Sequence, residues 1–156
     1  MEHSNGRTGE QENRGERAYS YRNLDVWKRA QRLTVEIVRL TASFPRSPAA
    51  DILARQIIRS SSSIGANIAE GHARFSLGAF RNHLQIARGS TGETDNFLAL
   101  LLELKMIDGG TEARLHAECD GLMGALTNRI NSLEQRGTKR VGEDAATYHT
   151  SDDAAD

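Results

Sequence analysis

Apolar residues recur at alternating intervals of three and four positions in four successive stretches of the chain, a pattern typical of amphipathic α-helices. The first predicted helix spans residues 24–43, with Asn23 as its N-cap and Pro45 ending it. Its apolar stripe comprises Val26, Ala30, Leu33, Ile37, Leu40 and Phe44. One side of this helix is therefore expected to face a core.

The second predicted helix spans residues 48–70. Ser47 followed by Pro48 is a typical helix start, and Gly71 suits the position just after a helix end. Its apolar stripe comprises Leu53, Ile57, Ile64 and Ile68. Four serines at positions 60–63 interrupt this stripe with small side chains.

The third predicted helix is the longest, residues 77–106, with Ser76 as its N-cap. Its stripe comprises Phe80, Leu84, Ala87, Thr91, Thr94, Leu98 and Leu101. The Gly109–Gly110 pair separates it from a fourth helix, which begins at Thr111 and ends near Gln135. The stripe of the fourth helix comprises Leu115, Cys119, Leu122, Leu126, Ile130 and Leu133.

Short connections between long helices force neighbouring helices to run antiparallel. The sequence therefore predicts an all-α protein, an antiparallel up-down-up-down four-helix bundle over residues 20–136. Residues 1–19 and the acidic tail 137–156 are polar and poor in apolar side chains, so we expect both to be disordered.

The end of the third helix is apolar on almost every side between residues 97 and 107. One bundle covers only part of such a helix, which favours a subunit interface. The interface candidates are Leu100, Leu102, Met106 and Ile107. The alternative is burial under the N-terminal arm or a loop.

Glycine occurs five times inside the predicted helices, where it costs about 0.5–1 kcal/mol relative to alanine. These positions are Gly65, Gly89, Gly92, Gly121 and Gly124. Gly89 and Gly92 fall level with the serines at 60–63 across the antiparallel hairpin. Our hypothesis is that the glycines and serines let these two helices approach closely.

The net charge of −1 hides a strong asymmetry. Residues 20–90 hold 11 Lys and Arg against 4 Asp and Glu, and residues 91–135 hold 3 against 8. The candidate nucleic-acid-binding residues are Lys28, Arg32, Arg55, Arg59, Arg74, Arg81 and Arg88, with Arg39 continuing the row on the first helix. Clustered arginines suit phosphate binding. The alternatives are a solvated face or intersubunit ion pairs, and Glu36 could pair with Arg32 or Arg39.

Metal and catalytic motifs are weak in this chain. His116 and Cys119 lie one turn apart, but two ligands do not make a zinc site, and Cys119 falls on an apolar stripe. Phosphate-loop, zinc-protease and nucleophile-elbow motifs are all missing from the sequence. We therefore expect no enzymatic activity, no cofactor and no metal.

The N-terminal 19 residues lack the apolar stretch of a secretory signal, and the longest apolar run, residues 97–102, is far shorter than a membrane helix. These features favour a cytoplasmic protein.

Several motifs stand in order along the chain. Residues 56–74 read QIIRSSSSIGANIAEGHAR, and residues 83–94 read HLQIARGSTGET. Upstream stand Leu24, Val26–Trp27 and the Phe44–Pro45 pair. Over residues 24–133 the chain resembles the bacterial four-helix bundle family named for the 23S rRNA intervening-sequence protein. It departs locally from the family pattern after Gly89-Ser90-Thr91, where the family has its Glu. Here Gly92 follows first, so Glu93 stands within one residue of the expected position.

The resemblance implies a ring-shaped homopentamer without known enzymatic activity. Some members are encoded inside insertions in 23S rRNA genes, and a related branch is the accessory protein of diversity-generating retroelements, which binds nucleic acid and a reverse transcriptase. The motif's polar residues Gln56, Asn67 and Glu70, with Arg74, could form a recognition site or a structural network between helix ends and subunits. The leading function is a homo-oligomer that binds RNA, DNA or a nucleic-acid-processing partner. The alternative is a structural or adaptor oligomer.

Overall fold

The computed structural model describes residues 20–74 and 76–149, with side chains described as far as residue 138. In this part of the chain there are no strands, which confirms the all-α class. The elements are a short 3-10 helix η1 (Tyr21–Asn23) and the α-helices α2 (Asp25–Thr41), α3 (Pro48–Ala73), α4 (Leu77–Glu103) and α5 (Gly109–His149).

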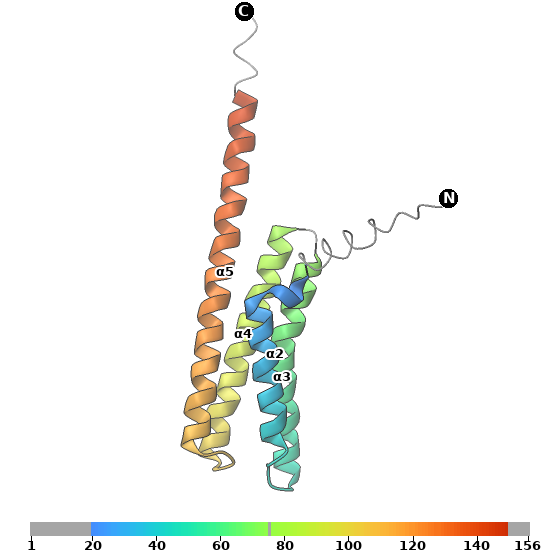
Figure 1. Cartoon of the computed structure of the whole chain (residues 1–156), viewed down its shortest axis with the longest axis vertical. Coiled ribbons are helices and arrows are strands. Elements are labelled where there is room, and N and C mark those ends of the chain that lie inside the picture. The colour runs from blue at the N-terminus through green and yellow to red at the C-terminus, as the bar shows by residue number, and fades with distance from the viewer. Residues whose placement is uncertain (1–19, 75, 150–156) are drawn as a thin grey trace, which may run out of the picture.

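The four α-helices lie side by side, with the chain running down α2, up α3, down α4 and up α5 in Figure 1. Each helix packs against its sequence neighbour, and α2 also contacts α5. The core consists of the predicted stripes: every stripe residue of the third and fourth predicted helices is buried. Full burial of one Leu or Ile side chain contributes about 1.5–3 kcal/mol, so these stripes contribute substantially to stability.

The first helix begins differently from the prediction. Ser20 caps η1 by accepting a hydrogen bond from the backbone N–H of Arg22, at 3.2 Å. The N-cap of α2 is Leu24, which offers no side-chain hydrogen bond, so the predicted role of Asn23 as N-cap is wrong. The Tyr21 and Trp27 rings pack edge to face, with centroids 5.2 Å apart, and hold η1 against α2.

The start of α3 is as predicted, but its end is not. The Ser47 hydroxyl accepts a hydrogen bond from the backbone N–H of Ala50 at 3.1 Å, with Pro48 in the first turn. The helix continues through Gly71 to Ala73. A Cβ at Gly71 would lie 2.5 Å from the Cβ of His83, so this glycine is needed for close packing against α4 rather than for a helix end.

Hydroxyl groups pair with one another across the α3–α4 contact. The Thr94 hydroxyl donates to the Ser60 hydroxyl at 3.0 Å, and the Ser90 hydroxyl donates to the Ser63 hydroxyl at 3.1 Å. The prediction that the serines at 60–63 face this stretch of the next helix therefore holds.

The predicted role of the glycines in this contact is wrong. A Cβ at Gly89 or Gly92 would meet nothing within 4 Å. Ser90 and Thr94 face α3 instead, because they lie on the buried side of α4 while Gly89 is exposed.

A tight reversal joins α4 to α5. Lys105 has a φ of 55°, and the backbone N–H of Met106 reaches back to the carbonyl of Leu101 at 2.9 Å, which ends α4 at Glu103 rather than at Met106. Asp108 then caps α5, because its side chain accepts from the backbone N–H of Thr111 at 2.9 Å and from its hydroxyl at 2.6 Å.

The last helix differs from the prediction at both ends. It begins at Gly109, ahead of Thr111, and continues to His149, past the end expected near Gln135. The structure thus has a helix at residues 137–149, where the sequence predicts disorder. The apolar stripe stops at Leu133, so this extension projects beyond the other helices in Figure 1. The predictions for residues 1–19 and 150–156 lie outside the described residues.

Two glycine substitutions test the α3–α4 packing. Gly71→Ala should lower the free energy of unfolding by about 1–3 kcal/mol, because the new methyl group overlaps His83. Gly89→Ala, its matched control on α4, should raise the free energy by about 0.5–1 kcal/mol, since it faces open space in a helix. Urea denaturation monitored by circular dichroism measures both. Equal destabilisation by the two variants would contradict this packing.

Candidate nucleic-acid interface

The outward face of α2 carries a row of cations. Lys28, Arg32 and Arg39 are all exposed and make no ion pair within the described part of the chain. Glu36 does not pair with either arginine; it pairs with Arg114 of α5. The row is therefore unneutralised along the length of the helix.

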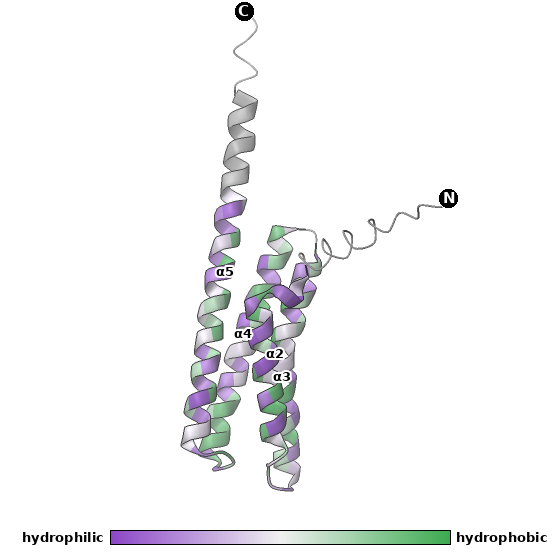
Figure 2. Ribbon diagram, viewed as in Figure 1, coloured by the Kyte–Doolittle hydropathy of each residue, from purple (hydrophilic) through white to green (hydrophobic). Residues whose placement is uncertain are grey.

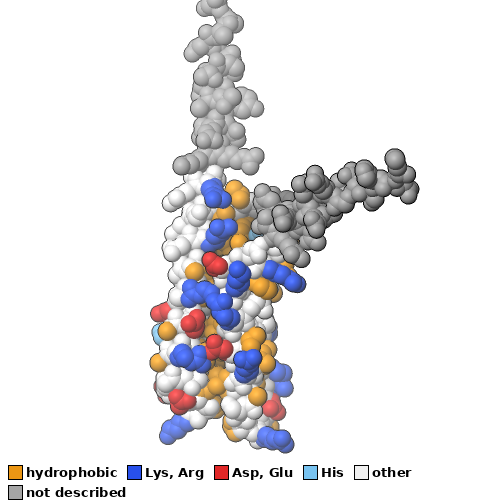
Figure 3. All heavy atoms as spheres, viewed as in Figure 1, with side chains coloured by type: hydrophobic (Ala, Val, Ile, Leu, Met, Phe, Trp, Pro, Cys, Tyr) orange, Lys and Arg blue, Asp and Glu red, His pale blue; other side chains and the backbone are white. Residues whose placement is uncertain are grey.

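The neighbouring helix α3 carries further exposed cations. Arg55 and Arg59 lie one turn apart, are exposed, and likewise have no ion-pair partner among residues 20–74 and 76–138. α2 and α3 are in direct contact, since the Thr34 hydroxyl donates to the carbonyl of Ser61 at 2.9 Å. We call the five residues Lys28, Arg32, Arg39, Arg55 and Arg59 the cationic α2–α3 surface. Figure 3 shows Lys and Arg side chains spread over the visible side of the bundle, with several acidic side chains between them.

The predicted cations of α4 are not part of this surface. Nη1 of Arg81 lies 3.3 Å from Oε1 of Glu134 on α5. Arg81, Arg88 and Asp95 are seven residues apart in turn, so they lie on one face of α4. Asp95 contacts His116 of α5, as Arg81 contacts Glu134, so this face of α4 is turned towards the acidic α5. Arg88 is exposed and has no ion pair among the described residues, but it stands apart from Arg55 and Arg59.

The polar residues of the family-like stretch form a hydrogen-bonded network within one chain. Nδ2 of Asn67 donates to the carbonyl and hydroxyl of Ser63, at 2.8 and 3.0 Å, and its Oδ1 lies 3.4 Å from Nδ1 of His83. Nη2 of Arg74 lies 2.7 Å from Oε1 of Glu70. The Arg74 hydrogen bond, followed by the charge of His83, lowers the pKa of Glu70.

This network gives Asn67, Glu70 and Arg74 partners inside their own chain, which is what a structural role requires. Arg74 is therefore less available to a phosphate than Arg55 or Arg59. Gln56 is half-buried and makes no side-chain hydrogen bond within the described residues.

The interface candidates divide between core and surface. Ile107 is only 8% exposed and belongs to the protomer's own core, so its prediction as an interface residue is wrong. Leu102 and Met106 are half-buried and also pack against the core. Leu100 is 39% exposed.

The interface candidates from the sequence did not include two members of the remaining apolar patch, Ile52 and Leu104. Ile52 of α3 is 53% exposed, and Leu104, just after α4, is 52% exposed. Ser60 and Thr94 are hydrogen-bonded across the two helices. Ile52 lies eight residues before Ser60, and Leu104 lies ten residues after Thr94. Because α3 and α4 run antiparallel, Ile52 and Leu104 stand at the same level of the bundle, near Leu100. We call Ile52, Leu100 and Leu104 the apolar α3–α4 patch. Figure 2 shows the hydrophobic end of α4 at which it lies.

Cys119 is not poised to react as a thiolate. Burial, reinforced by the charges of Asp95, Asp120 and Glu118, raises the pKa of the Cys119 thiol to about 12, so it remains protonated. No group of three or more metal-ligating side chains was found in the described part of the chain. None of its helices is long and apolar enough to cross a membrane.

The fold and surface together define a helical bundle with a hydroxyl-lined α3–α4 contact and unneutralised cations on two adjoining helices. Residues 22–128 match the family described as 23S rRNA-intervening sequence protein, and this match covers more than half of the chain, so the chain belongs to that family.

A solved structure supports the same relationship. The chain is similar to a protein of unknown function from the S23 ribosomal protein family of Bacteroides thetaiotaomicron VPI-5482, with a TM-score of 0.63 and 28% sequence identity. The similarity covers 67% of this chain and 97% of that one. No match was found among curated proteins.

The α4–α5 ion pair of His116 makes stability depend on pH. Nδ1 of His116 lies 2.7 Å from Oδ1 of Asp95, and this hydrogen bond is the main cause that raises the pKa of His116 above 6.5, ahead of the charges of Asp95, Asp120 and Glu112. The protonated form favours the folded state. The stabilisation of the folded state by the His116–Asp95 pair is complete below pH 6.5, and it is lost as the pH rises through the raised pKa of His116.

Asp95→Asn should return the pKa of His116 towards 6.5, measured by NMR titration of the imidazole resonances. Asp120→Asn is the matched control and should lower that pKa less, because Oδ2 of Asp120 lies 3.8 Å from Nε2. A larger effect from Asp120→Asn would refute this assignment.

Proposed function

We propose that this chain is a non-enzymatic homo-oligomer whose cationic α2–α3 surface binds RNA or DNA. The observation that supports this most directly is the set of exposed cations on adjoining helices, without carboxylate partners among the described residues. Unneutralised cations repel one another, and a phosphate backbone relieves that repulsion while releasing its own counterions. Four of the five residues are arginine, whose planar guanidinium suits two-oxygen contacts to phosphate.

We also propose the finer architecture: an up-down-up-down bundle that assembles as a ring-shaped homopentamer. The apolar α3–α4 patch supports self-association, because it places three large aliphatic side chains together on the exterior. Ring assembly would repeat the cationic surface around the ring, so weak contacts to one nucleic acid would add up.

The family name connects its members with sequences that interrupt 23S rRNA. On that basis we propose a cytoplasmic protein whose protein partner, if it has one, is a reverse transcriptase or another nucleic-acid-processing protein.

The second candidate is a structural or adaptor oligomer that does not bind nucleic acid. The ion pairs that already join the basic and acidic halves within one chain, such as Arg81–Glu134 and Arg114–Glu36, favour it. Similar pairs between subunits would use the cationic surface for assembly.

Binding to a generic RNA should fall steeply as salt rises, measured by fluorescence anisotropy over a salt series. The double variant Arg55→Gln/Arg59→Gln should weaken binding and reduce the slope of log K against log salt by about 1.5, because each lost phosphate contact removes about 0.7–0.9. Arg74→Gln/Arg81→Gln is the matched control with a smaller effect, since both residues are paired. If the folded oligomer binds no RNA even at low salt, the adaptor function is correct.

Leu100→Glu/Leu104→Glu should convert the oligomer to a monomer, because it places charges in the apolar α3–α4 patch. Both side chains are exposed, so helicity measured by circular dichroism should not change. Leu77→Glu, an exposed leucine at the opposite end of α4, is the control and should preserve the oligomer. Light scattering measures the mass, and an unchanged mass in the double variant would place the interface elsewhere.

A further inference from the structure

Arg129 of α5 is a half-buried cation without a carboxylate partner among the described residues. Its Nε is buried and has no hydrogen-bond partner. The guanidinium lies over the Phe80 ring, with Cζ 6.0 Å from the ring centroid, and makes no ion pair with any described carboxylate. Removing a charged donor from water without a partner is costly. An anion beside the guanidinium would offset this cost through its charge.

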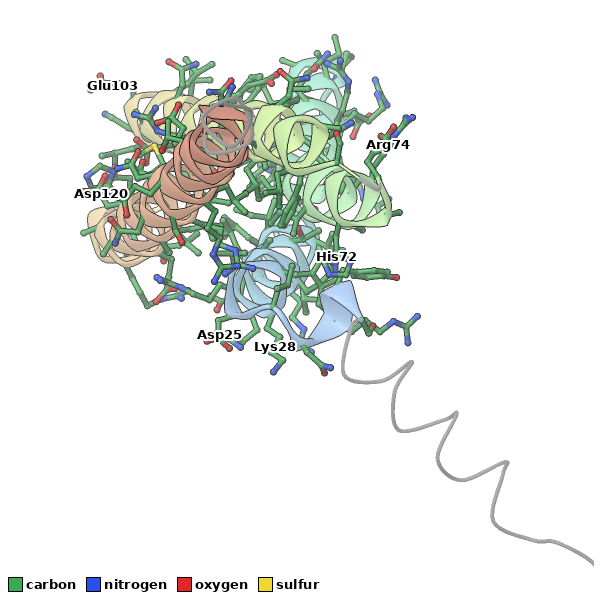
Figure 4. All side chains as sticks on the ribbon, turned by 90° about the horizontal axis from the view of Figure 1, so that it is seen from above. Asp25, Lys28, His72, Arg74, Glu103 and Asp120 are labelled. Atoms are coloured by element: carbon green, nitrogen blue, oxygen red, sulfur yellow. The ribbon has the colours of Figure 1, made fainter. Side chains whose placement is uncertain are left out.

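An open pocket of about 510 Å³ lies beside this side chain. Asn128, Arg129 and Ser132 line it from α5, and Leu24 and Asp25 line it from the start of α2. Figure 4 looks down on this end of the bundle, with Asp25 labelled on the first turn of α2. The pocket thus brings an amide and a hydroxyl, both hydrogen-bond donors, to the same place as the guanidinium.

The first turn of α2 adds to this arrangement. The N-cap residue Leu24 provides no side-chain hydrogen bond to the turn that follows it. The first backbone N–H groups of a helix have no partner within the helix, and the helix dipole favours negative charge at this end. These groups supplement Arg129 and would not make a site without it.

We propose that this pocket binds a phosphoryl oxyanion, with Arg129 as the residue that holds it. Because Nε is buried, Nη1 and Nη2 are the guanidinium nitrogens that can donate to two oxygens, while Asn128, Ser132 and the first turn of α2 can donate to the others. This site is separate from the cationic α2–α3 surface, since it lies between α2 and α5 and contains none of that surface's residues.

Asp25 is the one carboxylate that lines the pocket. It is exposed and forms no ion pair with Arg129 in the structure. Its charge disfavours an anion nearby, and a rotation of its side chain is the competing way to neutralise Arg129. The experiment must therefore separate an external phosphate from Asp25.

The test adds inorganic phosphate to the full-length protein at constant ionic strength, with chloride as the replaced salt. Phosphate should raise the melting temperature along a saturating curve, and the backbone amide resonances of Asp25–Trp27 should shift with the same midpoint. Arg129→Gln should weaken phosphate binding about tenfold or more, because it removes a charge-assisted two-oxygen contact. Arg129→Lys keeps the positive charge but loses the planar guanidinium that contacts two oxygens, so this variant should bind phosphate with intermediate affinity.

Arg46→Gln is the matched control, an exposed arginine outside both the pocket and the cationic α2–α3 surface, and it should keep the full phosphate effect. An equal loss in Arg46→Gln would overturn the proposal, as non-specific charge would then explain the binding. Binding that occurs only after Asp25→Asn would also overturn it, because Asp25 would be the natural partner of Arg129. The absence of saturable amide shifts in the wild-type protein would overturn it without relying on any variant.

The source of the phosphoryl group is a separate question for the same variants. If Arg129→Gln weakens phosphate binding but leaves RNA affinity unchanged, the ligand is a free phosphate or small phosphorylated molecule. If both fall, the pocket takes a phosphate of the nucleic acid. Either result supports the site, and neither depends on the proposed RNA binding, because the phosphate titration stands alone.

Discussion

The close packing of α3 against α4 is the contact on which the rest of the structure depends. Its hydroxyl pairs, Ser60–Thr94 and Ser63–Ser90, are separated by three or four residues along each helix, so both form only in one register. Gly71 allows the backbones to approach at the other end of the same contact. Hydroxyls that satisfy each other at short range tolerate burial, whereas larger side chains would push the helices apart. This contact therefore fixes the rotation of both helices.

That rotation decides which residues are left on the outside. With Thr94 turned to α3, Asp95 is turned to α5, where it meets His116, and the arginines at heptad spacing before it follow the same side. The cations of α4 consequently lie beside the acidic α5. The five cations of the cationic α2–α3 surface have no such partner among the described residues, whereas Arg29 of α2 does contact Glu118 of α5. The uneven distribution of charge along the sequence thus becomes an uneven distribution in space.

The helix stripes could be predicted from the sequence because burial repeats every three or four residues, and stripe residues such as Leu84 and Leu126 are fully buried. The all-α class followed from them. The roles of the glycines could not be predicted in this way. Gly71 resembles a helix end and Gly89 resembles a packing contact, yet the structure reverses both, because the difference depends on what the neighbouring helix places opposite them.

The candidate site was predictable only in part, for a related reason. Exposure of Arg55 and Arg59 follows from their position opposite the stripe of α3, which the sequence contains. The partner of Arg81, the burial of Ile107 and the exposure of Ile52 depend on contacts between helices far apart in the sequence. Nothing in the sequence marked Arg129 as a candidate binding residue, because a single arginine beside an apolar stripe is common on solvated helices.

The two kinds of arginine on this protein should respond differently to their surroundings. The cationic α2–α3 surface is exposed, so mobile ions screen it within about 8–10 Å at moderate salt. Arg129 is half-buried between α5 and the start of α2, where its Nε is shielded from water and the field of a bound oxyanion is screened less. Rising salt therefore weakens contacts to the outer surface before it weakens those in the pocket. Burial, rather than the number of charges, is what separates a surface that collects polyanions from a pocket that can hold one phosphate in a defined orientation.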